Sequence, residues 1–154
     1  MRNKAVILVL VVSLVFNAAL LYLFMIRGEN VGITDDNRIV IRMSDQSREH
    51  IMTEMRTFLE SIRHIQQGIA SDNRSQIELV GNESGNCRME HVPKGLLRTL
   101  PLGFKKLGMN THDLFDDIAR SAKEDYNKKI MEEKLSRILT NCTTCHSTYQ
   151  ITAY

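Results

Sequence analysis

An uncharged stretch at the N-terminus constrains the fold of this chain more than any other feature. Residues 5–26 contain no charged side chain over 22 positions, and only Ser13 and Asn17 interrupt the apolar run. A helix of about 20 apolar residues is long enough to cross the hydrocarbon core of a bilayer. A cleaved signal peptide has a shorter apolar region, roughly 7–15 residues, before a site of small residues, and the end of this run, "LFMIRGEN", offers no such site. We therefore expect residues 1–27 to be an uncleaved membrane anchor.

The charges on either side of this anchor predict its orientation. Arg2 and Lys4 precede the apolar run, whereas Arg27 follows it and is itself followed by several acidic residues. Because the more positive flank stays in the cytoplasm, we expect the rest of the chain outside the cytoplasmic membrane, in a bacterial periplasm. Those 127 residues carry 17 basic and 18 acidic side chains. They show no basic stripe, so nucleic acid is not an expected partner.

The clearest periodic pattern predicts a long helix after a short stalk. Residues 28–43 are expected to form the stalk, in which "VGI" and "RIVI" could pair weakly. Ser44 or Ser47 can cap the helix that follows, by accepting a hydrogen bond from a free backbone N–H, and the helix is expected to end near residues 71–73. Apolar residues recur in it at alternating steps of four and three, which is typical of a helix packed against other helices; they are Ile51, Met55, Phe58, Ile62, Ile65 and Ile69.

The rest of the chain also indicates helices. "SQIELV" predicts a short helix and "GNESGN" a loop, and "KGLLRTL" predicts one or two apolar turns between Pro93 and Pro101. A further helix is expected to start at Thr111, because acidic residues follow it where the helix dipole is positive. A turn at residues 125–127 precedes a last helix from about Lys128. No segment of the sequence is rich in predicted strands. The expected fold is therefore all-α: one transmembrane helix, then a four-helix bundle in residues 44–154.

The last predicted helix ends in the motif "NCTTCHSTYQI". Residues three and four positions apart share one face of a helix, so Cys142, Cys145 and His146 are expected to project together. Two thiols so placed can form thioethers with the vinyl-derived carbons of a haem, while the imidazole binds its iron. C-x-x-C-H is the signature of c-type haem attachment. We therefore expect one covalently bound haem c per chain.

Other functions of this motif fit less well. A structural zinc site takes four ligands, usually from two spaced pairs; Cys87 and His91 could complete such a site, but their spacing is unusual. A thioredoxin-like dithiol needs a βαβ context, which the sequence lacks. Cys87 is a third, odd cysteine. It could be a buried apolar residue, a redox-sensitive thiol or an intermolecular partner.

The chain resembles the class II c-type cytochromes, the cytochrome c′ family, which are four-helix bundles with the haem motif near the C-terminus. The similar segments are "NCTTCHSTYQ", "REHIM" and "LGMNTHDLFDDIARSAKED", within residues 44–150. The resemblance implies these roles: Cys142 and Cys145 as thioether anchors, His146 as the proximal iron ligand, Arg48 beside a haem propionate, and Met52 facing the iron. The chain departs from the family in its membrane anchor, in its irregular middle region with two prolines, and in Gln150, near which the family often has a basic residue.

The residue opposite His146 decides the chemistry that the resemblance implies. If Met52 is a ligand, His/Met coordination suits electron transfer; if Met52 only fills space, the iron stays open to small gases. His112 could instead be the ligand, although we expect it to lie on the surface at a helix start.

The function expected from the sequence is therefore that of a carrier rather than an enzyme. We expect a membrane-tethered cytochrome that passes one electron to or from membrane or periplasmic redox proteins. The alternative is a five-coordinate haem protein that binds nitric oxide or carbon monoxide. By resemblance, the chain could also form a homodimer through the first helix of the bundle, although the transmembrane span could supply the dimer contact instead.

Overall fold

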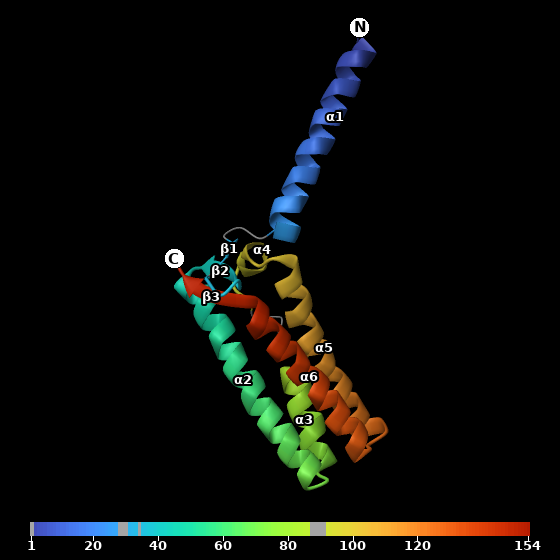
Figure 1. Ribbon diagram of the computed structural model, residues 1–154. Helices are drawn as coiled ribbons and strands as arrows, with labels where there is room; N and C mark the ends of the chain where they lie inside the picture. The colour runs from blue at the N-terminus through green and yellow to red at the C-terminus, as the bar shows by residue number, and fades with distance from the viewer. Residues whose placement is uncertain (1, 28–30, 34, 87–91) are drawn as a thin grey trace.

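The structure is a computed structural model that describes residues 2–27, 31–33, 35–86 and 92–154. It is mostly helical (Figure 1). Its elements, in chain order, are α1 (Arg2–Leu21), the π-helical turn η1 (Tyr22–Arg27), β1 (Val31–Ile33), β2 (Ile39–Met43), α2 (Asp45–Ala70), α3 (Arg74–Ser84), α4 (Leu96–Thr99), α5 (Leu102–Glu124), α6 (Lys128–Thr148) and β3 (Tyr149–Ala153).

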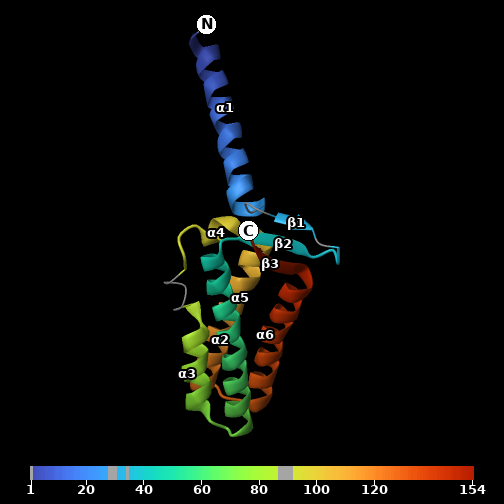
Figure 2. The same ribbon diagram turned by 90° about the vertical axis from the view of Figure 1, so that its left-hand side faces the viewer.

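The N-terminal helix stands apart from the rest of the molecule. It projects from one end of the other helices (Figures 1 and 2). Among the described residues, Lys4–Arg27 is the one helical segment that is long and apolar enough to cross a membrane, and none of its apolar window is buried within the chain. The expected N-terminal apolar helix is therefore confirmed.

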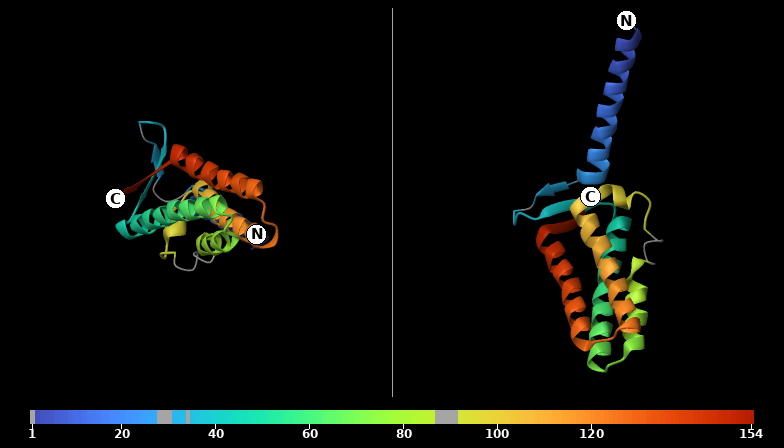
Figure 3. Two further views of the ribbon diagram at one scale, coloured as in Figure 1. Left: turned by 90° about the horizontal axis from the view of Figure 1, so that it is seen from below. Right: turned by 90° about the vertical axis from the view of Figure 1, so that its right-hand side faces the viewer.

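Four longer helices surround a common core. Helix α3 packs against α2 and α5, and α6 packs against α5 and α2, so the contacts among the four form a closed ring; Figure 3 shows the group from below and from the side. Of the apolar residues at alternating steps of three and four in α2, all except Ile51 belong to this core or pack against it. We call it the lower core; its buried members are Phe58, Ile65, Ile69, Ile77, Leu114, Phe115, Ile118, Ala122, Met131, Leu135 and Ile138.

Local capping explains where two of these helices begin. The side-chain oxygen of Ser44 accepts a hydrogen bond from the backbone N–H of Ser47 at the start of α2, and that of Asn127 accepts one from Ile130 at the start of α6. Each bond satisfies a backbone donor that has no partner within the helix. The predicted starts of both helices are confirmed.

Two predicted boundaries are wrong. Helix α5 begins at Leu102, directly after Pro101, and not at Thr111. Proline suits the first position of a helix, and the apolar side of α5 already starts at Phe104, which is buried. Likewise α3 continues to Ser84, so residues 81–84 of the segment predicted as the loop "GNESGN" are helical. In both places glycine is tolerated inside a helix because tertiary packing outweighs its low propensity.

A small sheet, which the sequence analysis did not predict in full, closes the end of the ring nearest α1. Strand β2 lies in the middle, antiparallel to β1 and parallel to β3, with Ile39 opposite Tyr149 and Met43 opposite Ala153. The weak pairing expected of "VGI" and "RIVI" is confirmed, whereas β3 was not expected. Residues 39–43, expected to be part of a stalk, form a strand whose Ile41 and Met43 are fully buried.

The sheet contributes to a second cluster of buried apolar residues, which we call the upper core. It consists of Ile41, Met43, Ile51, Leu96, Leu100 and Phe104. The upper core lies near the anchor, together with α4 and the C-terminus, whereas the α2–α3 and α5–α6 turns lie at the opposite end (Figures 1 and 2). The motif at the end of α6 is therefore on the anchor side of the molecule.

We predict that Gly81→Ala destabilises the fold by about 1–3 kcal/mol, because added atoms in a tightly packed region force neighbours apart. A Cβ at Gly81 would lie 2.8 Å from the Cβ of Ala119 and 2.9 Å from the carbonyl oxygen of Phe115. Urea unfolding followed by circular dichroism measures the effect. Leu79→Ala, on the exposed side of the same helix, is the control and should change stability by only about 0.5 kcal/mol. Equal stabilities of the two variants would contradict the close approach of α3 and α5.

Candidate functional site

The three residues of the C-x-x-C-H motif lie in the last two turns of α6, just before β3 begins. Cys142 and Cys145 are half-buried, and both are free thiols. His146 is exposed, and its side chain borders the same space as Cys145. The structure thus brings the three predicted residues to one side of α6, as their spacing requires.

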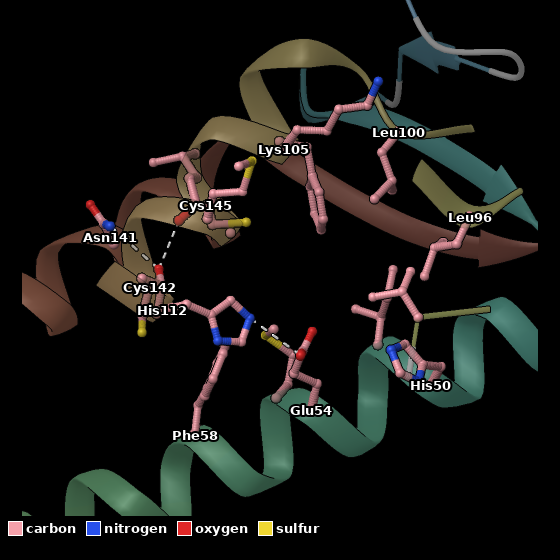
Figure 4. A pocket seen from close by; sticks show the side chains of 18 of the residues that line it. His50, Glu54, Phe58, Leu96, Leu100, Lys105, His112, Asn141, Cys142 and Cys145 are labelled. Atoms are coloured by element: carbon pink, nitrogen blue, oxygen red, sulfur yellow. Dashed lines mark hydrogen bonds and ion pairs between the residues drawn. The ribbon is translucent and has the colours of Figure 1, made fainter. Parts of the chain in front are cut away.

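These residues border an apolar space that we call the larger cavity (Figure 4). Its empty volume is about 840 Å³, a figure that includes space open to solvent. Its walls come from α2, α4, α5 and α6. The apolar residues among them are Ile51, Met55, Phe58, Val92, Leu96, Leu97, Leu100, Phe104, Leu107 and Met109.

A second space, the smaller cavity, lies beside the same motif. Its empty volume is about 540 Å³. It shares Cys145 and His146 with the larger cavity, together with Ile51, Met55 and Phe104. Residues of β3 and of the segment before β2 complete its walls. Cys145 and His146 thus border both cavities, and either cavity could receive part of a flat cofactor.

The protein environment keeps both motif cysteines protonated. Burial raises the pKa of Cys142, and burial together with the neighbouring Cys142 raises the pKa of Cys145 to about 11. Metal binding and disulfide exchange both require the thiolate. Thiols with a raised pKa are weak nucleophiles at pH 7, which argues against the dithiol interpretation. Among the described residues, no three His, Cys, Asp or Glu side chains are placed to hold a metal ion; Cys87 and His91 lie outside those residues.

His112 lies in the wall of the larger cavity, and its expected surface position is wrong. Because α5 begins earlier than expected, His112 is in the middle of the helix and only 3% exposed. Its Nδ1 is 2.8 Å from the carbonyl oxygen of Ser84, and its Nε2 is 3.4 Å from Oε1 of Glu54 (Figure 4). The ring packs edge-on against Phe58.

Both ring nitrogens of His112 thus face hydrogen-bond acceptors. A histidine can satisfy two acceptors only when both nitrogens carry a proton. Burial alone lowers the pKa of His112, but the bonds to Glu54 and to the backbone of Ser84 outweigh it, and the pKa is raised from its ordinary value of 6.5. In this arrangement His112 has no free lone pair for a metal.

The two residues that the resemblance places on the first helix lie differently. Met52 is half-buried and borders the smaller cavity but not the larger one. Arg48, one turn earlier on α2, is exposed and borders neither cavity. The cations that do border them are Arg38, at the smaller cavity, and Lys105, at the larger one.

Sequence reasoning missed Arg38, Lys105 and Glu54 as residues of the site. Arg38 donates hydrogen bonds to Asp36 and to the side chain of Gln150, which follows the motif. Arg38 directly precedes β2, so a prediction of the pairing between β2 and β3 would have placed it near Gln150. No pattern in the sequence marks Glu54 as the partner of His112, because the two residues lie on different helices.

Comparison of the chain with protein-family models, with curated proteins and with solved structures finds no match. The function of this site therefore has to be argued from the motif, the two cavities and the residues around them.

We predict a pH dependence of stability that comes from His112. A histidine whose pKa is higher in the folded state stabilises the fold fully below its unfolded pKa, and this contribution is lost as the pH rises through the folded pKa. Thermal unfolding midpoints should therefore fall as the pH rises above about 6.5, and Glu54→Gln should flatten that slope. Glu49→Gln removes an exposed carboxylate from the same helix, one that pairs with Arg56 and not with a histidine, and serves as the control. An unchanged slope in Glu54→Gln would contradict the pairing.

Proposed function

We propose that this chain is a membrane-tethered c-type cytochrome that carries one electron through a covalently bound haem. The observation that carries the proposal is the position of Cys142, Cys145 and His146 on the wall of a largely apolar cavity. A C-x-x-C-H motif alone indicates haem attachment. A motif that lines an apolar space also supplies the kind of environment that a haem needs.

The residues of the site fit a haem in three respects. The thiols of Cys142 and Cys145 are free and neutral, and would hold the porphyrin through two thioether bonds. His146 would hold the iron. Buried apolar side chains would exclude water from the porphyrin faces: Leu96, Leu100 and Phe104 are all less than 10% exposed. When bound, haem c supplies the one-electron chemistry of its iron.

Charged residues of the cavities have a separate role in this proposal. Arg38, which borders the smaller cavity, is our candidate for the cation beside a haem carboxylate, in place of Arg48, to which the resemblance gave that role. The Glu54–His112 pair places an acidic and a basic side chain 3.4 Å apart beside the larger cavity. Burial and nearby charges are the means by which a protein sets the potential of a bound haem.

The packing of the helices supports a four-helix bundle as the fold of this domain. Helices α2, α3, α5 and α6 contact each other in a closed cycle, and the motif lies on the last of them. In such bundles, cofactor sites are built from side chains on facing helices. Here α2 and α5 face α6 across the larger cavity.

The N-terminal helix supports the membrane location. Residues Lys4–Arg27 are long and apolar enough to span a bilayer, and the flanking charges favour the orientation with the N-terminus inside and the haem domain in the periplasm. A tether of this kind raises the effective concentration of redox partners at the membrane. We propose membrane or periplasmic redox proteins as those partners.

One observation favours a second candidate function. Met52 borders only the smaller cavity, and His112 has both nitrogens engaged. Neither Met52 nor His112 is thus placed to bind iron within the larger cavity. This favours a five-coordinate haem that binds nitric oxide or carbon monoxide. Met55 borders both cavities, so its thioether is another candidate for the position opposite His146.

We expect haem to remain on the protein after denaturing electrophoresis when the chain is expressed in a host that attaches haem to C-x-x-C-H motifs. Replacement of both Cys142 and Cys145 by serine should abolish the haem stain, because thioether bonds alone survive denaturation. Cys87→Ser is the matched control, since it removes a cysteine outside the motif, and it should retain the stain. A wild-type protein without stain would refute the proposal.

Optical spectra of the purified protein separate the two candidate functions. An electron carrier should give a sharp reduced α band that carbon monoxide does not change. If Met52 is the ligand, Met52→Leu should give a high-spin spectrum that carbon monoxide shifts, whereas Met55→Leu should not; the reverse result would assign Met55. A wild-type spectrum that is already high-spin and shifts with carbon monoxide would favour the gas-binding function.

A further inference from the structure

We propose that α4 and the start of α5 form a surface that lies on the bilayer and binds anionic phospholipid headgroups. The inference rests on the membrane span proposed above. It concerns a different part of the molecule from the motif, and three observations carry it: where the anchor ends, what that end contacts, and how charge is distributed along α5.

The anchor is longer than the hydrocarbon core of a bilayer. The segment Lys4–Arg27 has 24 residues, which is about 36 Å at the helical rise of 1.5 Å per residue. The hydrocarbon core is about 30 Å thick. The last turn of the anchor, η1, therefore reaches the headgroup layer.

Helices α4 and α5 contact this last turn directly. The ammonium group of Lys105 lies 3.3 Å from the carbonyl oxygens of both Phe24 and Met25, which are among the carbonyls left without a partner at a helix end. The guanidinium of Arg98 lies 5.6 Å from the centre of the Phe24 ring. In Figure 4, Lys105 extends away from His112 and out of the larger cavity. These contacts place α4 and the start of α5 at the level of the headgroups.

This part of the chain is rich in positive charge. Between residues 91 and 112 there is no Asp or Glu, and the four charged residues are Lys94, Arg98, Lys105 and Lys106. Leu97, among these cations, is 47% exposed. Clusters of Lys and Arg beside a transmembrane helix bind anionic lipids, and an exposed leucine next to them suits insertion between headgroups.

The start of α5 is charged against the helix dipole. It carries Lys105 and Lys106, whereas the acidic residues Asp113, Asp116 and Asp117 lie in the middle of the helix. Acidic residues are favoured near the start of a helix and basic ones near its end, so the two lysines reduce the stability of the isolated helix. An anionic lipid surface would compensate for this loss. The acidic part of α5 then lies farther from the membrane.

The proposed surface also faces the site. Leu96, Leu97, Leu100 and Lys105, all on α4 or α5 or between them, border the larger cavity. Contact with headgroups along α4 therefore covers that side of the cavity. A redox partner held in the membrane would meet the haem domain at this end.

Amide hydrogen exchange in nanodiscs tests the surface on the full-length protein. The two lipid compositions are phosphatidylcholine alone and equal parts of phosphatidylcholine and phosphatidylglycerol. Each Lys or Arg close to an anionic surface strengthens binding by about fivefold, so we expect residues 94–106 to exchange about tenfold more slowly, or slower still, in the anionic discs. Residues 74–84, in α3, should exchange equally in both.

Two charge variants make the test specific. Replacement of Lys94, Arg98 and Lys106 by glutamine should remove the difference between the lipids. Replacement of Lys123, Lys128 and Lys129 by glutamine, at the opposite end of the domain, changes the net charge equally and should preserve it. Inorganic phosphate added to the phosphatidylcholine discs should not slow exchange; if it does so as strongly as the anionic lipid, the site binds free anions and the proposal is wrong.

Failure of this inference can be distinguished from failure of the proposed function. A chain that alkaline carbonate removes from vesicles does not span the membrane, which refutes both the anchor and the surface. A chain that is retained, but whose residues 94–106 exchange equally in the two lipids, refutes the surface alone. The haem stain described above is independent of both results.

Discussion

The parallel pairing of β2 with β3 is the interaction on which the arrangement of the site depends. It joins Ile39–Met43, which precede the first helix of the ring, to Tyr149–Ala153, which directly follow the motif. The C-terminal end of α6 is thereby fixed beside the anchor, and Ile41 and Met43 are buried beneath it. Without this pairing, α6 would end in a free strand, and the smaller cavity would lack the wall that Tyr149, Gln150 and Ile151 form.

The lower core and the upper core differ in what surrounds them. The lower core is built from buried side chains of all four long helices. The upper core borders both cavities, and Ile51 and Phe104 line both of them. Unfilled space beside apolar side chains lowers stability, and this cost falls on the upper core.

Regular, local patterns were predictable from the sequence. The apolar spacing of α2, the cap at Ser44 and the face shared by Cys142 and Cys145 all depend on the geometry of one helix, and the structure agrees with each of them. Non-local features were not predictable in this way. Strand β3 has too few residues to show a period, and it exists because β2 provides a partner for its backbone. The expected surface position of His112 was wrong because α5 starts at Leu102 and not at Thr111, which puts His112 in the middle of the helix.

The pairing of Ile39 with Tyr149 joins residues that are far apart along the chain, and such contacts form slowly because a long loop has to close first. The ring of helices, whose neighbours are mostly consecutive in sequence, can therefore assemble before the sheet does. During that interval the C-terminal end of α6 is not yet held by β2, so the thiols of Cys142 and Cys145 are more accessible than in the folded chain.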